Sequence, residues 1–186
     1  MDKDPVLHLK FTHLTDDNQA LDSSGRGHHG TIHGAAQVVP DQTFGACLQL
    51  DGSDDCVQIL AAEDFDFMSK DFSVEFWAKK QDDNTGYIFS QGVATEYQGI
   101  HIGFRDFNTF TFAFYGGAYD IGFSNDMEWH HWACVYYSDT KKHFIYRDGI
   151  KIGEGASSSP YQGSGYVFSV KAKQAGGMPM RLVGRS

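Results

Sequence analysis

The chain has 186 residues, of which 41% are hydrophobic and 15% aromatic, so it can form a domain with a substantial core and is not disordered. Its formal net charge of −9 argues against nucleic-acid binding, because phosphates need a surface rich in lysine and arginine. The acidity suits solubility, calcium or a neutral polar ligand such as a sugar.

No segment approaches the roughly 20 apolar residues of a membrane span, so membrane insertion is not expected. Residues 1–11 lack the layout of a signal peptide. Two interpretations remain: an intracellular protein, or part of a longer extracellular or cell-surface protein. The three cysteines, Cys47, Cys56 and Cys134, have no regular spacing, which favours buried thiols over a disulfide framework.

Extended segments recur roughly every 8–14 residues, separated by Gly, Asp, Asn and Ser, and helical periodicity is nearly absent. Near the N-terminus, residues 6–11 alternate apolar and polar. Residues 46–50 and 56–60 form two further predicted strands. A turn centred on Ser53 would pair Cys56 near Leu50 rather than with Cys47, which is a second reason to expect no disulfide.

Later segments repeat the alternation. In residues 71–80, Phe72, Val74 and Phe76 share one face, whereas Glu75 and Trp77 share the other. Residues 99–105 and 109–116 follow the same scheme, with a set of inward side chains consisting of Ile100, Ile102, Phe104, Phe110, Phe112 and Phe114.

The last third of the chain adds turns and a final strand. Asp148-Gly149 predicts a hairpin, because a type I′ turn needs positive φ. Residues 153–165 read as a Gly/Ser-rich surface loop, and residues 180–186 as a short closing strand. A dozen or so antiparallel strands without helices predict an all-β sandwich or barrel, and since no linker divides the chain, residues 1–186 are predicted to form a single domain.

Two adjacent histidines, His130 and His131, lie in the predicted strand "WHHWACVY". Neighbouring strand residues point to opposite faces, so the two imidazoles cannot chelate one metal together. Both faces of this segment are largely apolar, which predicts a central strand covered on each side. We therefore expect His131 to be a buried core histidine with a satisfied hydrogen bond.

Residues 129–153 resemble the G-W-H-H-V-A…Y-V-D-G hallmark of laminin G-like (LamG-like, pentraxin-like) domains of the concanavalin A-like lectin/glucanase superfamily. Other segments match in family order: residues 7–34, "FGACLQLDGSDDCVQI", "FSVEFWAKK" and "IFSQG". The resemblance implies a two-sheet antiparallel jelly-roll sandwich in which His131 and Asp148 are structural. It also implies a final strand that pairs with the first. Since the chain stops at Ser186, this strand is either replaced, or residues 6–11 form an open edge that invites self-association or a partner chain.

The resemblance also suggests ligand sites. Relatives with this fold bind or cleave polysaccharides on the concave sheet. In this chain the outward residues Glu75, Trp77, His101, Arg105 and Tyr115 are expected to form one polar and aromatic face, where rings stack on sugars and charged groups hold hydroxyls. Glu96, Tyr97 and Asn108 are candidate ligand residues on rim loops.

Two groups of residues near the N-terminus are candidate metal ligands. Residues 21–30 resemble the family's calcium-binding or loop-tying segment, so Asp22 is the candidate calcium ligand, with turn formation as the alternative. The histidines His28, His29 and His33 have a spacing that zinc could use, although the adjacent glycines favour a tight loop.

Catalytic motifs of the superfamily are incomplete in this chain. Glu75 stands without the second carboxylate that retaining glucanases need. Residues 98–105 lack the Q-x-H spacing of alginate lyases, and "HIGFR" has glycine where galectins carry asparagine. The sequence therefore predicts a non-catalytic, lectin-like module for glycan, glycoprotein or another cell-surface ligand, with calcium as an optional aid. Two alternatives are a protein-assembly module, and a polysaccharide lyase or hydrolase using His101, Arg105 and Tyr115.

Overall fold

The computed structural model describes residues 4–50, 54–80, 85–117, 119–172 and 180–184. The strands in this part of the chain are β1 (Leu7–Leu14), β2 (Gln19–Asp22), β3 (Gly30–His33), β4 (Gln37–Asp41), β5 (Gly45–Gln49), β6 (Cys56–Ile59), β7 (Phe72–Ala78), β8 (Gly86–Gly92), β9 (Gly99–Phe104), β10 (Thr109–Phe114), β11 (Asp120–Gly122), β12 (His130–Tyr137), β13 (Lys142–Arg147), β14 (Ile150–Ala156), β15 (Val167–Ala172) and β16 (Met180–Gly184). A short 3-10 helix, η1 (Glu63–Phe65), lies between β6 and β7. No helix among these residues is long and apolar enough to cross a membrane.

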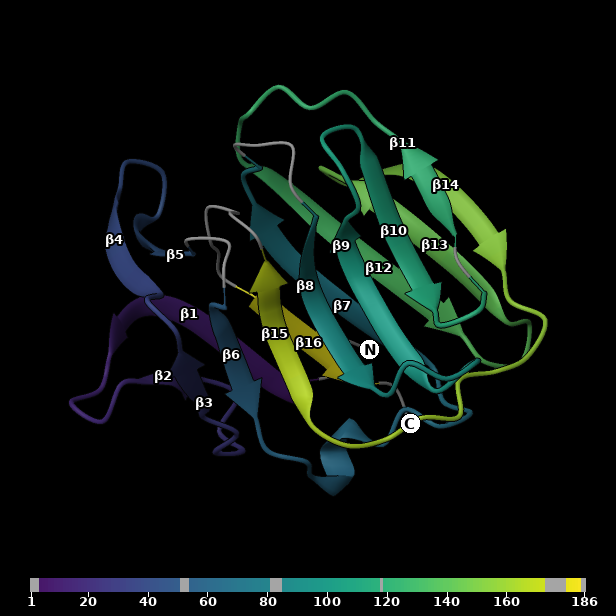
Figure 1. The fold of residues 1–186 in the computed structure, drawn as a ribbon, viewed down its shortest axis with the longest axis horizontal. Helices are drawn as coiled ribbons and strands as arrows, with labels where there is room; N and C mark the ends of the chain where they lie inside the picture. The colour runs from purple at the N-terminus through teal and green to yellow at the C-terminus, as the bar shows by residue number, and fades with distance from the viewer. Residues whose placement is uncertain (1–3, 51–53, 81–84, 118, 173–179, 185–186) are drawn as a thin grey trace.

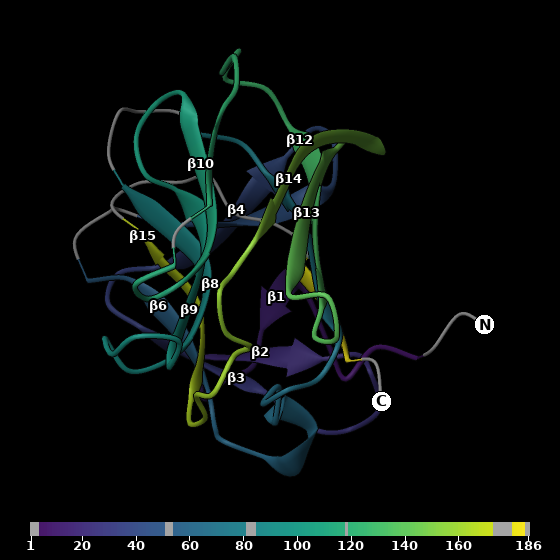
Figure 2. The same ribbon diagram turned by 90° about the vertical axis from the view of Figure 1, so that its right-hand side faces the viewer.

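The strands form two packed layers, which confirms the predicted antiparallel jelly-roll sandwich (Figures 1 and 2). We call the layer with β6, β15, β8, β9, β10 and β11 the front layer, and the layer with β1, β16, β7, β12, β13 and β14 the back layer. Hydrogen bonding continues from β6 through β3 and β2 to β1, so both layers belong to one fourteen-stranded sheet folded over on itself. The β4–β5 hairpin forms a separate two-stranded sheet.

The core between the layers is aromatic. Phe110 on β10 stacks on Trp132 on β12, with ring centroids 4.2 Å apart and an interplanar angle of 5°. The side chains predicted to face inward are buried, including Phe72, Val74, Phe76, Ile100, Ile102, Phe104, Phe112 and Phe114. Because alternate residues of each strand fill this core, the residues between them face outward on either side of the sandwich.

The first strand is not an edge. β1 lies between β2 and β16, and Leu7 is paired with Leu182. Of the two alternatives for the final strand, replacement is therefore confirmed, because β16 pairs with β1, and the alternative of an open edge at residues 6–11 is wrong. The edges of the fourteen-stranded sheet are β11 and β14.

The strands on either side of residues 51–55 belong to different pairs. β5 pairs with β4, whereas β6 pairs with β3 and β15, so the predicted pairing of Cys56 near Leu50 is wrong. Cys47 is paired with Val39 and Cys56 with His33, and no disulfide joins the three cysteines.

The predicted Asp148-Gly149 hairpin is confirmed between β13 and β14, with φ of 51° and 77° at the two turn residues. The following loop is shorter than expected, because residues 153–156 extend β14. Gly153 and Gly155 leave room for Ile121 and Tyr119 to pack against this strand, which explains why the glycines lie there.

Candidate functional site

The predicted polar and aromatic face is divided between the two layers. Glu75 and Trp77 lie on β7 in the back layer, whereas His101, Arg105 and Tyr115 belong to the β9–β10 region of the front layer. All five side chains point away from the core, but they do so on opposite sides of the sandwich. The prediction of one shared face is therefore wrong, since alternation reveals only that a residue faces outward and not on which side.

Trp77 is part of a packed aromatic cluster on the back layer. Its ring centroid is 5.1 Å from that of Phe44, at the tip of the β4–β5 hairpin, and 5.5 Å from that of His131. Phe44 also contacts Trp129, whose Nε1 donates to Asp41 at 3.0 Å. These contacts hold the hairpin on the back layer, which is a structural task for Trp77.

The burial of His131 differs from the prediction. Its side chain is 32% exposed on the outer face of β12, and its Nε2 lies 3.9 Å from Glu75 Oε2. The expected buried core histidine is therefore wrong, because only the face of β12 that carries Trp132, Cys134 and Tyr136 lies in the core.

His130 is tied to the surrounding loops by carboxylates. Its Nδ1 lies 2.6 Å from Asp148 Oδ2, and its Nε2 lies 2.9 Å from Asp126 Oδ1. Arg147 also pairs with Asp126, at 3.1 Å, and contacts the imidazole. The other oxygen of Asp148 accepts a hydrogen bond from the backbone N–H of His131 at 3.0 Å. The two histidines thus face separate partners, and Asp148 anchors the start of β12.

The rim residues Glu96 and Tyr97 lie in the loop from β8 to β9. Tyr97 is half-buried, packs beside Gly117 and is hydrogen-bonded through its hydroxyl to Ser158, so it joins this loop to the segment after β14. Glu96 is exposed beside Gly116. Tyr115, 47% exposed, lies at the same end of the front layer, since the backbone of Tyr97 donates to its carbonyl at 2.7 Å.

Asn108 lies at the opposite end of β9 and β10, in the turn that joins them. Its Oδ1 accepts from the backbone N–H of Asn125 at 3.2 Å, and its own N–H donates to Asp106 Oδ1 at 2.9 Å. Along β10, residues 109 and 115 are separated by about 20 Å at the usual rise per residue. The rim candidates therefore belong to two ends of the sandwich and form no single site.

Asp22 ties together the loop before β3. Its Oδ1 accepts from the backbone of His8 and of Ser24, each at 2.9 Å, and its Oδ2 accepts from the Ser24 hydroxyl at 2.6 Å and the backbone of His28 at 3.0 Å. Burial opposes ionisation, but these hydrogen bonds outweigh it and lower the pKa of Asp22. The contacts fit the loop-tying role, and calcium binding by Asp22 stays a prediction.

The three histidines of the N-terminal loops have separate partners. His28 pairs with Asp64 at 2.9 Å, His29 accepts from the backbone of Asp22, and His33 contacts Gln58. Within the described ranges, no three His, Cys, Asp or Glu side chains are arranged to hold a metal ion.

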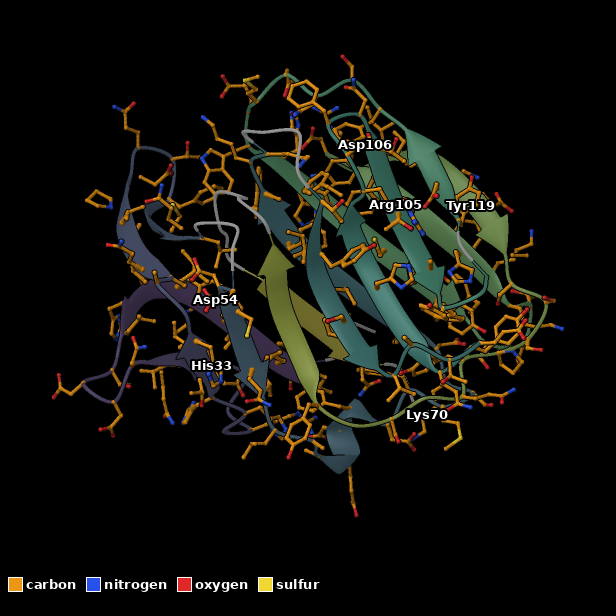
Figure 3. The ribbon with its side chains drawn as sticks, in the orientation of Figure 1. His33, Asp54, Lys70, Arg105, Asp106 and Tyr119 are labelled. Carbon is orange, nitrogen blue, oxygen red and sulfur yellow. The ribbon has the colours of Figure 1, made fainter. Side chains whose placement is uncertain are left out.

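The front layer carries a cluster that we call the front-face site: Tyr87, His101, Arg105, Thr111 and Asp120. Arg105 Nε donates to Asp120 Oδ1 at 2.8 Å, and both side chains are more than one-third exposed. The rings of Tyr87 and His101 are 5.0 Å apart. Thr111 is paired with Asp120 on one side and Gly103 on the other, so these outward residues adjoin one another. Figure 3 shows Arg105 over β9 and β10, far from His33 and Asp54 near β6.

The environment keeps His101 uncharged near neutral pH. The pKa of His101 is lowered to about 4, chiefly by burial and also by the Arg105 guanidinium, while Asp120 opposes the decrease. The site thus combines two uncharged rings with one ion pair. Such a surface can stack against an apolar ring face while exchanging hydrogen bonds with polar groups at its edge.

The sequence identified two members of this site, His101 and Arg105, and missed Tyr87, Thr111 and Asp120. Alternation placed Thr111 on the outward face but gave no reason to choose it. Tyr87 follows a segment with no clear pattern, and Asp120 lies in a three-residue strand. Their proximity follows from strand order, which no local pattern reveals.

The two packed antiparallel layers are the fold of a concanavalin A-like β-sandwich. A family model described as the concanavalin A-like lectin/glucanases superfamily, of the laminin G type, matches residues 51–181, and the chain belongs to this family. No curated protein sequence matched the chain.

Solved structures support the same fold. The binding domain of a paraclostridial mosquitocidal protein is 16% identical with a TM-score of 0.70, and the match covers 97% of this chain and 48% of that one. Domain 4 of the extracellular arabinanase AbnA from Geobacillus stearothermophilus, in complex with arabinotriose, is 14% identical with a TM-score of 0.68. This match covers 100% of this chain and 96% of the AbnA domain. The binding domain of botulinum neurotoxin DC in complex with SialylT is 20% identical with a TM-score of 0.62. This match covers 97% of this chain and 46% of the neurotoxin domain. The chain thus spans about half of the two toxin domains.

Proposed function

We propose that this chain is a non-catalytic carbohydrate-binding module and that the front-face site contacts the sugar. The observation that carries the proposal is the combination of the Tyr87–His101 ring pair with the Arg105–Asp120 ion pair on neighbouring strands of the front layer. Sugars present both apolar C–H faces and dense hydroxyl groups, which match rings and paired charges respectively.

Two comparisons support this proposal. Domain 4 of AbnA matches nearly end to end and is described in complex with arabinotriose, and a botulinum neurotoxin binding domain is described in complex with SialylT. AbnA is described as extracellular, which supports an extracellular place for this chain within a longer protein. Calcium assistance remains part of the proposal and is tested below.

The test is a glycan array with the intact chain, run with and without a chelator. Arg105→Ala should abolish most of the binding, because it removes the exposed donors of the site. The matched control is Arg26→Ala, which breaks another exposed Arg–Asp pair, with Asp64 at 2.9 Å, on a different part of the surface. Binding that Arg105→Ala leaves unchanged, or that Arg26→Ala reduces equally, would contradict the assignment of the site.

A lyase activity is the second candidate, favoured by the contact between Tyr87 and His101. A histidine with a pKa of about 4 is neutral at physiological pH and could accept a proton, with a tyrosine as its partner. The original set of His101, Arg105 and Tyr115 is less suitable, because Arg105 and Tyr115 lie near opposite ends of the strands. Release of unsaturated sugar products from a panel of uronic polymers, lost in Tyr87→Phe, would favour the lyase; binding without turnover would exclude it.

A role as a protein-assembly module is the third candidate function. It cannot use the first strand as a binding edge, because β1 is paired on both sides. Light scattering of the intact chain over a range of concentrations tests it directly. A monomer that binds glycan on the array supports the carbohydrate proposal over this alternative.

A further inference from the structure

The front-face site has balanced charge and open hydrogen-bonding capacity. Arg105 and Asp120 neutralise each other through the single bond from Nε to Oδ1. The two terminal amino groups of Arg105 and the Oδ2 of Asp120 take no part in this bond, and both side chains are more than one-third exposed. The exposed pair therefore presents donors and an acceptor side by side.

Thr111 adds an unused polar group directly next to this pair. Its side chain is fully buried, and its hydroxyl has no hydrogen-bond partner among the described residues. A buried hydroxyl without a partner is destabilising, so its presence needs a reason other than packing. On the opposite side Thr111 faces Gly103, which has no side chain to bond it.

Resting on the proposed function, we infer that the front-face site selects a neutral sugar by two adjacent hydroxyl groups. Arg105 donates a hydrogen bond to the oxygen of one hydroxyl, and Asp120 accepts a hydrogen bond from the adjacent hydroxyl. Thr111, which is paired with Asp120 across the two strands, supplies the third polar group of the set. An anionic sugar would meet the carboxylate of Asp120 and a chain with a formal net charge of −9.

The remaining members of the site agree with a neutral ligand. Tyr87 and His101 place two rings side by side next to the ion pair. Since burial holds His101 uncharged at neutral pH, it adds no positive charge that would attract a carboxylate. Arg105 is thus the one cation of the front-face site, and Asp120 already pairs with it.

Calorimetric titration of the intact chain tests the selectivity. The probes are a neutral arabino-oligosaccharide and a galacturonate oligosaccharide of equal length. We expect at least tenfold tighter binding of the neutral probe. Equal or tighter binding of the galacturonate probe would overturn the inference while leaving the proposed function intact. Binding of neither probe, together with an empty glycan array, would overturn both.

Two variants test the residues. Thr111→Val keeps the shape and removes the hydroxyl, so it should raise the melting temperature while weakening neutral-sugar binding several-fold, a combination that a purely structural role does not produce. Asp120→Asn should weaken binding of the neutral probe at least tenfold, whereas the control Asp64→Asn, which alters the Arg26 pair, should not. Wild-type binding of the neutral probe by both site variants would overturn the inference.

Discussion

We expect His143 to make the sandwich sensitive to acid. It is 1% exposed and lies between the rings of Phe112, Phe114 and Tyr136, at centroid distances of 4.6, 4.8 and 5.0 Å. Neither ring nitrogen has a hydrogen-bond partner among the described residues. Burial therefore lowers the pKa of His143 from 6.5 to about 4.

The sign and size of the effect follow from linkage. Between pH 6.5 and about pH 4 the unfolded chain binds a proton at His143 and the folded chain does not, so the free energy of unfolding falls as the pH falls through this window. At about 1.4 kcal/mol per pKa unit, the lowered pKa of His143 corresponds to about 3 kcal/mol in the free energy of unfolding. This part of the stability is present above pH 6.5 and fully lost below about pH 4. We expect His143→Leu to remove this loss.

The assay is urea unfolding followed by tryptophan fluorescence at several pH values from neutral to acidic. The difference in free energy of unfolding between wild type and His143→Leu should change by about 3 kcal/mol across the window. Other titrating groups cancel in that difference. His13→Leu, at an exposed position on β1, is the control and should follow the wild-type profile. Parallel profiles for wild type and His143→Leu would refute the reasoning.

Three further predictions concern residues outside the front-face site. Asp22→Ala should lower the free energy of unfolding by about 2–3 kcal/mol, because four donors lose their acceptor. Calcium bound at Asp22, as proposed, should raise the melting temperature of the wild type above its value in a chelator, and Asp22→Ala should abolish that rise; equal melting temperatures with calcium and with a chelator would contradict a calcium site at Asp22. Trp77→Ala should cost about 1–3 kcal/mol through lost contact with Phe44 yet leave glycan binding unchanged, and lost binding without lost stability would restore Trp77 as a ligand residue. Asp148→Ala should cost about 2 kcal/mol in chemical unfolding, because His130 and the start of β12 lose their shared anchor, and an unchanged midpoint would contradict that role.

The sequence determined the class of fold and the inner face of several strands. Alternation along residues 71–80, 99–105 and 109–116 identified the core phenylalanines correctly, because side-chain direction in a strand depends only on the parity of the residue number. The Asp148-Gly149 turn was equally local, since positive φ is a property of the turn residues themselves.

Only the tertiary structure decided which outward residues meet. Trp77 and His101 have the same local pattern, yet β7 lies in the back layer and β9 in the front layer. The sequence left open whether β1 lies at an edge, and the structure places it inside the sheet, because β16 pairs with it from the far end of the chain. Strand order is fixed by the packing of segments distant in sequence, and the front-face site exists because β8, β9, β10 and β11 are neighbours in that order.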